Sequence, residues 1–118
     1  MTGVKRASRG MVLRSWSGRA TPAGARRYLA HFRRRVLPAL RQFPGHCGAF
    51  VLRPRRAGEV EVTVLTLWRS LATVRDFAGR DVGRAIVEPE ARAVLRRFDR
   101  RVAHFDVLLD SRRRKGGR

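Results

Sequence analysis

Residues 59–68 read Glu-Val-Glu-Val-Thr-Val-Leu-Thr-Leu-Trp, and this run is the clearest structural signal in the chain. Its first half alternates valine with glutamate or threonine, which is the two-residue period of a β-strand with one buried face. Over residues 65–68 both faces become apolar. Such a strand fits a sheet that is covered by helices on one face and by a second sheet or subunit on the other.

A second strand is predicted at residues 48–53, joined to this run by Pro-Arg-Arg-Ala-Gly in a hairpin. Residues 11–18 have the pattern of a first strand. Between them, Thr21-Pro22 begins an amphipathic helix whose apolar residues recur at three- and four-residue steps. We expect Pro38 to kink this helix or end its regular part, and Pro44-Gly45 to stop it.

Beyond the central strand, Ser70 is expected to cap a short helix that ends at Gly79. A further helix should open at residues 88–90, carry Phe98 in its apolar stripe and hold arginines near its end. Residues 101–109 are predicted as the last strand. The order β-α-β-β-α(α)-β is that of an α+β, ferredoxin-like fold with an antiparallel sheet and its helices on one face. The bare face predicts a homodimer, because a second copy would cover it.

The length of 118 residues is that of one domain. We place this domain at residues 11–110, between a basic flexible N-terminus (1–10) and a basic disordered tail (111–118). The sequence has no apolar run of the ~18 residues that a membrane helix needs and no signal-peptide pattern. Its single cysteine, Cys47, excludes an internal disulfide and a cysteine-based zinc site. These features predict a cytoplasmic protein without a membrane partner.

The net charge is +19, from 28 basic and 9 acidic residues. Lysine occurs only at positions 5 and 115, so arginine supplies nearly all of the positive charge. A coding bias toward arginine explains this excess without any partner. A nucleic-acid site would need the charges gathered on one face, with base-contacting or stacking groups among them. We therefore expect nucleic-acid binding to be at most weak and non-specific.

Several short motifs follow one another in a characteristic order and spacing: Trp16-Ser17-Gly18, Leu37-Pro38, Pro44-Gly45, Leu65-Thr66-Leu67-Trp68-Arg69-Ser70, Asp76-Phe77-Ala78-Gly79, Ala85-Ile86-Val87-Glu88-Pro89-Glu90 and Val102-Ala103-His104-Phe105-Asp106-Val107. Together they resemble the antibiotic biosynthesis monooxygenase family of dimeric α+β barrel proteins, over about residues 11–108. The resemblance implies a homodimer in which two sheets form a barrel. It also implies a pocket in each subunit between sheet and helices.

The family includes cofactor-independent oxygenases of aromatic polyketides and heme-degrading enzymes, and the resemblance to both rests chiefly on the tryptophan that aligns with Trp68. The chain departs from both patterns. The oxygenases have an asparagine and a tyrosine where this chain has Val64 and Val74, and the heme-degrading members have a histidine ligand near the position of Val87. We expect a cofactor-independent monooxygenase acting on a small aromatic or phenolic compound. The alternative is a non-catalytic small-molecule-binding or stress-associated protein that uses the same pocket.

Two residues are the candidates for catalysis. Trp68 lies at a strand end beneath the helices, where its indole would either stack on a flat ligand or pack in the core. His104 lies in the last strand, where it would act either as general base on a phenol or enol or as a hydrogen-bonded structural residue.

The expected substrate-binding residues are aromatic: Trp16, Tyr28, Phe32 and Phe77. The helical spacing explains Tyr28 equally well without a ligand. Three arginines are candidate anion-binding groups or solvated surface residues: Arg14, Arg69 and Arg84. The other histidines, His31 and His46, do not form metal-ligand spacing with His104, so neither a metal site nor a cofactor is expected.

Overall fold

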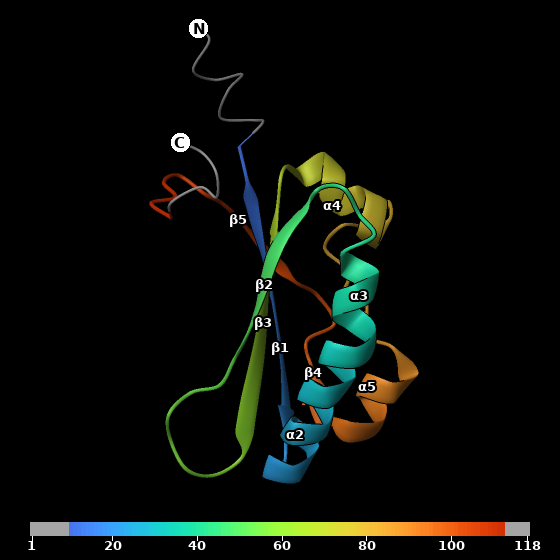
Figure 1. Ribbon diagram of the computed structural model, residues 1–118. Helices are drawn as coiled ribbons and strands as arrows, with labels where there is room; N and C mark the ends of the chain where they lie inside the picture. Colours follow the sequence, from blue (N-terminus) through green and yellow to red (C-terminus); the bar gives the residue numbers. More distant parts are fainter. Residues whose placement is uncertain (1–9, 113–118) are drawn as a thin grey trace, which may run out of the picture.

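The computed structural model describes residues 10–112 and shows one antiparallel sheet with helices on one side (Figure 1). The predicted N-terminal segment 1–10 and tail 111–118 lie almost entirely outside the described residues. The elements follow in the order β1 (Val12–Ala20), α2 (Pro22–His31), η1 (Phe32–Val36), α3 (Leu37–Leu40), β2 (His46–Leu52), β3 (Val60–Trp68), α4 (Leu71–Ala78), α5 (Pro89–Val94), β4 (Arg97–Phe98) and β5 (Ala103–Asp106).

The sheet has the strand order β2-β3-β1-β4, and β5 also pairs with β1. β5 pairs with residues 12–15 of β1, whereas β4 pairs with Gly18 and Arg19 further along the same edge. The two short strands therefore share the position of the fourth ferredoxin-like strand. The predicted α+β, ferredoxin-like class with an antiparallel sheet is confirmed.

The first helix begins as predicted, because the Thr21 side chain accepts a hydrogen bond from the Gly24 amide and Pro22 occupies the first turn. Its irregularity lies just upstream of Pro38. Residues Phe32–Val36 form a π-helical turn, and the Leu37 amide donates to the Phe32 carbonyl five residues back. Proline has no amide to continue the α-helical ladder, so the predicted disturbance at Pro38 takes the form of a π-turn.

The second half of the chain differs from the sequence expectation. The helix that starts at Pro89 ends at Val94, and Leu95 already has extended backbone angles. The prediction that Phe98 belongs to this helix is wrong, because Phe98 pairs with Gly18 in the sheet. The last strand is also shorter than predicted and covers only Ala103–Asp106. Hydrogen bonding to the edge of β1 outweighs the helical spacing of these apolar residues.

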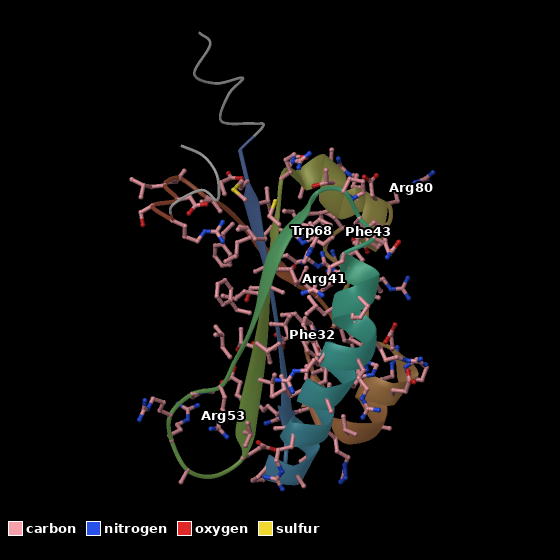
Figure 2. The ribbon with its side chains drawn as sticks, in the orientation of Figure 1. Phe32, Arg41, Phe43, Arg53, Trp68 and Arg80 are labelled. Atoms are coloured by element: carbon pink, nitrogen blue, oxygen red, sulfur yellow. The ribbon has the colours of Figure 1, made fainter. Side chains whose placement is uncertain are left out.

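The two faces of the sheet differ sharply. Toward the helices, β3 presents Val62, Val64, Thr66 and Trp68, all of which are buried. On the opposite face, large apolar side chains remain exposed, and these are Phe50 (51%), Leu52 (42%) and Phe105 (54%). Figure 2 shows Trp68 and Phe43 between sheet and helices, with Arg53 and Arg80 directed outward. None of the helices within residues 10–112 has both the length and the apolar character of a membrane span.

Candidate functional site

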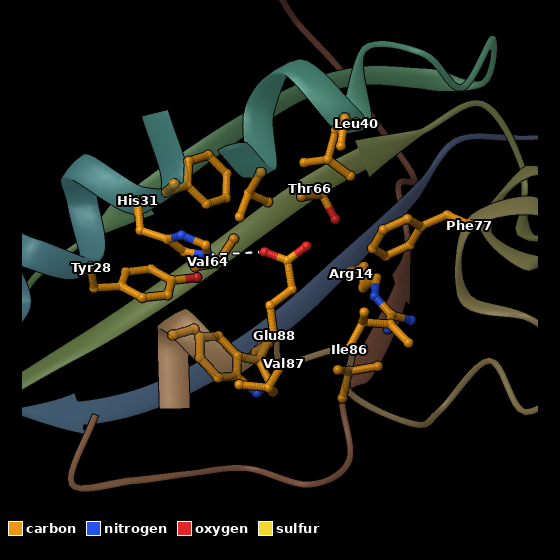
Figure 3. Close-up of a pocket in the computed structure, with 16 residues that line it drawn as sticks. Arg14, Tyr28, His31, Leu40, Val64, Thr66, Phe77, Ile86, Val87 and Glu88 are labelled. Carbon is orange, nitrogen blue, oxygen red and sulfur yellow. Dashed lines mark ion pairs between the residues drawn. The ribbon is translucent and has the colours of Figure 1, made fainter. Parts of the chain in front are cut away.

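A pocket lies between the covered face of the sheet and the helices, and it offers about 100 Å³ of free space (Figure 3). Most of its walls are apolar, and the aromatic or branched residues that line it include Trp16, Tyr28, Phe32, Leu40, Val64 and Phe77. Ligand pockets commonly reach several hundred Å³, whereas a cavity of about 150 Å³ accepts benzene. The space therefore suits a single ring, and a larger molecule needs the pocket to open.

One end of the pocket is formed by Arg14, which β1 directs toward the helices. The residue is only 5% exposed. Its guanidinium donates hydrogen bonds to the carbonyls of Val82 (2.6 Å) and Arg84 (2.9 Å). It also lies 3.0 Å from His104 Nε2 and over the ring of Phe77, 5.6 Å from the ring centroid. These contacts fix the guanidinium in one orientation.

The contact between Arg14 and His104 defines the protonation of the histidine. A guanidinium has no acceptor, so Arg14 must donate and His104 Nε2 must accept. The imidazole is then neutral, with its proton on Nδ1. Burial and the charge of Arg14 both lower the pKa of His104, which agrees with this assignment.

Within the part of the chain that the structure describes, the positive charge of Arg14 has no ionic partner. Among residues 10–112, no aspartate or glutamate forms an ion pair with it, and all of its hydrogen-bond partners are neutral. Burial lowers the pKa of Arg14 to about 10, so the side chain still carries its charge at neutral pH. A buried charge without a counter-ion is costly, so this arrangement is chemically suited to accept an anion at the pocket wall.

The opposite end of the pocket carries an acidic and hydroxylic group of side chains. Glu88, just before α5, extends its carboxylate into the pocket toward His31 (Figure 3), and Glu88 Oε1 lies 3.1 Å from His31 Nε2. Burial and the charge of Glu88 raise the pKa of Tyr28, so its hydroxyl stays protonated and can donate a hydrogen bond. The Glu88 side chain is 46% exposed, so it is packed less closely than Arg14.

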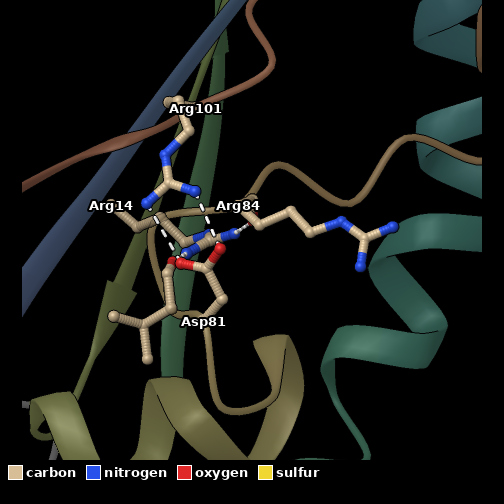
Figure 4. A network of polar contacts seen from close by, with 5 residues as sticks. Arg14, Asp81, Arg84 and Arg101 are labelled. Carbon is tan, nitrogen blue, oxygen red and sulfur yellow. Dashed lines mark hydrogen bonds and ion pairs between the residues drawn. The ribbon is translucent and has the colours of Figure 1, made fainter.

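The loop between α4 and α5 supplies part of both ends and is tied to the segment before β5 (Figure 4). Arg101 donates two hydrogen bonds to Asp81, at 2.8 and 3.0 Å. Backbone bonds join Val102 to Gly83 and Ala85 to Arg100. These ties position the carbonyls that hold Arg14 and shape the chain that leads to Glu88.

The four predicted substrate-binding residues, Trp16, Tyr28, Phe32 and Phe77, all line this pocket. The two candidate catalytic residues do not line it. Trp68 is fully buried, donates from Nε1 to Thr66 Oγ1 (2.9 Å) and stacks on Phe77 with ring centroids 5.5 Å apart. It supports two pocket residues from behind, and His104 contacts the pocket through Arg14.

Sequence reasoning missed the pocket roles of His31 and Glu88. His31 follows Tyr28 by three residues, so the helical period places both on the same helix face. The sequence therefore contained a signal for the position of His31. The position of Glu88 depends on how the loop after α4 returns to the helix, and no local pattern encodes that path. Of the three candidate anion-binding arginines, only Arg14 lines the pocket; the Arg69 and Arg84 side chains are exposed.

The chain is similar to known proteins in its sequence pattern and in its fold. The sequence pattern of the antibiotic biosynthesis monooxygenase family matches residues 11–89. Similar solved structures include a candidate antibiotic biosynthesis monooxygenase from Caulobacter crescentus (TM-score 0.65, 16% identity, covering 92% of this chain and 100% of that one). No curated protein matches the chain.

Two further similar structures have a described activity. The cofactor-independent oxygenase SnoaB from Streptomyces nogalater has a TM-score of 0.56 and 14% identity, covering 86% of this chain and 95% of that one. A heme-degrading protein from Mycobacterium tuberculosis has a TM-score of 0.55 and 27% identity, covering 86% of this chain and 96% of that one.

Proposed function

Because the chain belongs to the antibiotic biosynthesis monooxygenase family, we propose that it is a cofactor-independent monooxygenase of a small aromatic compound with an acidic phenol or enol. The observation that carries this proposal is the buried cation of Arg14 at the wall of an apolar pocket, with no acidic partner among residues 10–112. Because the guanidinium is only 5% exposed, water screens its charge weakly, and such a cation can stabilise a substrate anion.

The proposed chemistry uses dioxygen as the sole oxidant. The substrate carries a CH2 group that is made acidic by the neighbouring ring and carbonyl, as in the keto form of an anthrone-like phenol. Loss of a proton from this CH2 group gives an electron-rich enolate anion, which passes one electron to O2. The two radicals combine to form a carbon–oxygen bond, and a proton completes a hydroperoxide. Elimination of water then converts the original CH2 group into a carbonyl, so one oxygen atom enters the product and the other leaves as water.

Each pocket residue has a separate role in the proposed reaction. Arg14 holds the developing oxyanion, and Glu88 accepts the proton, with His31 beside it. The Tyr28 hydroxyl donates to a substrate oxygen. The rings of Phe32 and Phe77 form walls against a flat ligand.

Trp68 and His104 take indirect roles in this proposal. His104 accepts a hydrogen bond from Arg14 and holds the guanidinium toward the pocket. Trp68 supports Phe77 by stacking and orients the Thr66 hydroxyl. Both are therefore proposed as positioning residues, and their variants should affect turnover less than variants of Arg14.

Heme degradation is a weaker interpretation. At the position where the resemblance places the heme-ligating histidine, this chain has Val87, which lines the pocket and offers no coordinating atom. The free space of about 100 Å³ is also far smaller than a porphyrin requires. The residues present do not fit the group.

A homodimer is proposed as the working form, since family members are typically dimeric. The exposed Phe50, Leu52 and Phe105 would meet a second copy. A dimer would bury about 2,000 Å² or more in total. Light scattering should give twice 13.4 kDa, and a Phe50→Glu/Phe105→Glu double variant should shift the mass toward the monomer. A wild-type mass near 13.4 kDa would contradict the proposal.

Oxygen uptake with a panel of anthrone-like and smaller phenolic substrates, each with an acidic CH2 group, tests the activity. Wild type is compared with Arg14→Met and with the matched control Arg84→Met, whose side chain is exposed and does not line the pocket. Turnover that is lost only with Arg14→Met supports the proposal. Ligand binding without oxygen uptake would instead support the non-catalytic binding protein.

A further inference from the structure

Three potential metal ligands meet at the rim of the pocket. His31 ends α2, Glu88 directly precedes α5, and Glu90 lies in the first turn of α5. One ligand atom from each side chain lies within 4.8 Å of the other two. The cluster joins residues almost sixty positions apart, so only the packing of α2 against α5 creates it.

The buried Nε2 atom of His31 is the feature of this cluster that points to a ligand. Its side chain is only 9% exposed, and within residues 10–112 the Nε2 atom has no hydrogen-bond partner. The 3.1 Å approach of Glu88 Oε1 is close enough for an ion pair but lacks hydrogen-bond geometry. A buried polar atom without a partner is uncommon, and it is directed here at a carboxylate.

We propose that His31, Glu88 and Glu90 bind a divalent transition-metal ion such as Zn²⁺. One imidazole nitrogen and two carboxylate oxygens are ligand types that Zn²⁺ accepts, and they leave a coordination position for water. Zinc bonds of about 2.0–2.2 Å require ligand atoms about 3.4 Å apart, so any pair near the 4.8 Å limit must draw together. The two glutamates are 46% and 55% exposed and can make this movement while His31 stays in place.

The groups around the site set its affinity. Arg35 lies 3.3 Å from Glu90 Oε2 and competes with the metal for that carboxylate. Arg27 and Arg34 line the adjacent cleft and add positive charge. Removing Arg35 should therefore strengthen metal binding, whereas an exposed salt bridge of this kind contributes little to stability.

This inference goes beyond the proposed oxygenase, because metal binding does not require turnover. The two sites share His31 and Glu88. A bound cation would occupy the lone pairs that the proposed proton transfer uses, so saturating Zn²⁺ should slow oxygen uptake and a chelator should restore it. Glu90 belongs to the metal site alone, since it does not line the pocket. Substitution of Glu90 therefore tests metal binding without altering the residues proposed for oxygenase activity.

Calorimetric titration of the full chain with ZnCl₂ tests the proposal, with the visible spectrum of Co²⁺ as a second readout of the coordination. We expect one ion per chain. Loss of a ligand in His31→Gln or Glu90→Gln should weaken binding by about tenfold or more, and Arg35→Met should tighten it severalfold. Circular dichroism checks the fold, and the exposed Glu90 keeps the test valid if His31→Gln is unstable.

Two matched control variants each remove a different potential zinc ligand outside the proposed site. Glu61→Gln removes a carboxylate on β3, and Cys47→Ser removes the thiol beside His46. Both should bind Zn²⁺ as wild type does. The proposal is overturned if no saturable binding of one ion per chain occurs, if Glu90→Gln binds with unchanged affinity, or if Cys47→Ser abolishes binding. None of these results bears on oxygen uptake in metal-free buffer, so failure of one proposal is distinguishable from failure of the other.

Discussion

The two ends of the pocket are built in opposite ways. At one end, Arg14 is 5% exposed and is held by two backbone carbonyls, His104 and the ring of Phe77. At the other end, Glu88 is 46% exposed and has one ionic neighbour at 3.1 Å. The cationic end is fixed before any ligand arrives, whereas the acidic end can adjust to the ligand.

The fixed cation, Arg14, comes from a strand of the sheet, whereas the exposed carboxylate, Glu88, comes from a loop. A preorganised cation costs no rearrangement when charge develops on a substrate, so it contributes fully to the rate. A mobile carboxylate must first be placed, but it can serve ligands of more than one shape. We therefore expect the fixed end to dominate catalysis and the mobile end to respond to substrate and metal.

Replacing Arg14 should have the largest effect. Arg14→Met keeps much of the volume but removes the charge, and we expect kcat/KM for oxygen uptake to fall about 100- to 1000-fold. Arg14→Lys should recover only part of this loss, because an ammonium cannot reproduce the paired contacts to the Val82 and Arg84 carbonyls. Near-wild-type uptake by Arg14→Met would contradict the dominance of the fixed end.

Replacing Glu88 should have the next largest effect. Glu88→Gln removes the proton acceptor, and loss of a general base is expected to lower turnover about 100-fold. The unaffected control is Glu61→Gln, on a strand away from the pocket. Equal rates for the two variants, measured with an oxygen electrode, would show that the mobile end takes no part in proton transfer.

Replacing Trp68 should alter stability more than turnover. Trp68→Phe leaves a void behind Phe77 and removes the donor to Thr66, so the free energy of unfolding should fall by about 1–3 kcal/mol. Urea titration measures this change. Turnover should fall less than about threefold, because the indole lies behind the wall. A loss of turnover as large as that of Arg14→Met would give Trp68 a direct role.

The pH dependence of stability should report on His104. Its pKa is lowered from 6.5 in the folded protein, so on acidification the unfolded chain takes up the proton first. Stability is therefore highest above pH 6.5 and declines as the pH falls below it. His104→Gln should flatten the melting temperature between pH 7.5 and 5. His46, whose pKa is also lowered, will retain part of the slope. An unchanged slope in His104→Gln would contradict the neutral assignment.

The fold was largely predictable, because short local patterns in the sequence indicate strands and the first residues of helices. Alternation marked β3, and Thr21-Pro22 and Ser70 marked two helix starts that the structure shows. The error at Phe98 arose because its spacing from Ala91 and Leu95 fits a helix. The pairing of Phe98 with β1 depends on contacts distant in sequence, which such spacing cannot reveal.

The site was only half predictable for the same reason. Aromatic residues on a helix stripe or an inward strand face were identifiable, and these line the pocket. The charge of Arg14, which has no acidic partner in the described part of the chain, was not identifiable among so many arginines, since this property depends on which residues surround it in space. The meeting of His31 with Glu88 depends on the path of a loop. Both features need three-dimensional neighbours.

The central claim is that Arg14 is a fixed cation that stabilises a ligand anion in the pocket. The most direct test is a spectroscopic pH titration of bound 4-nitrophenol, whose single ring suits the pocket and whose phenolate absorbs visible light. We expect its pKa to be lower on wild-type protein than in free solution, and to return toward the solution value on Arg14→Met but not on Arg84→Met. An unchanged pKa on the wild type, or the same lowering on Arg14→Met, would contradict the claim.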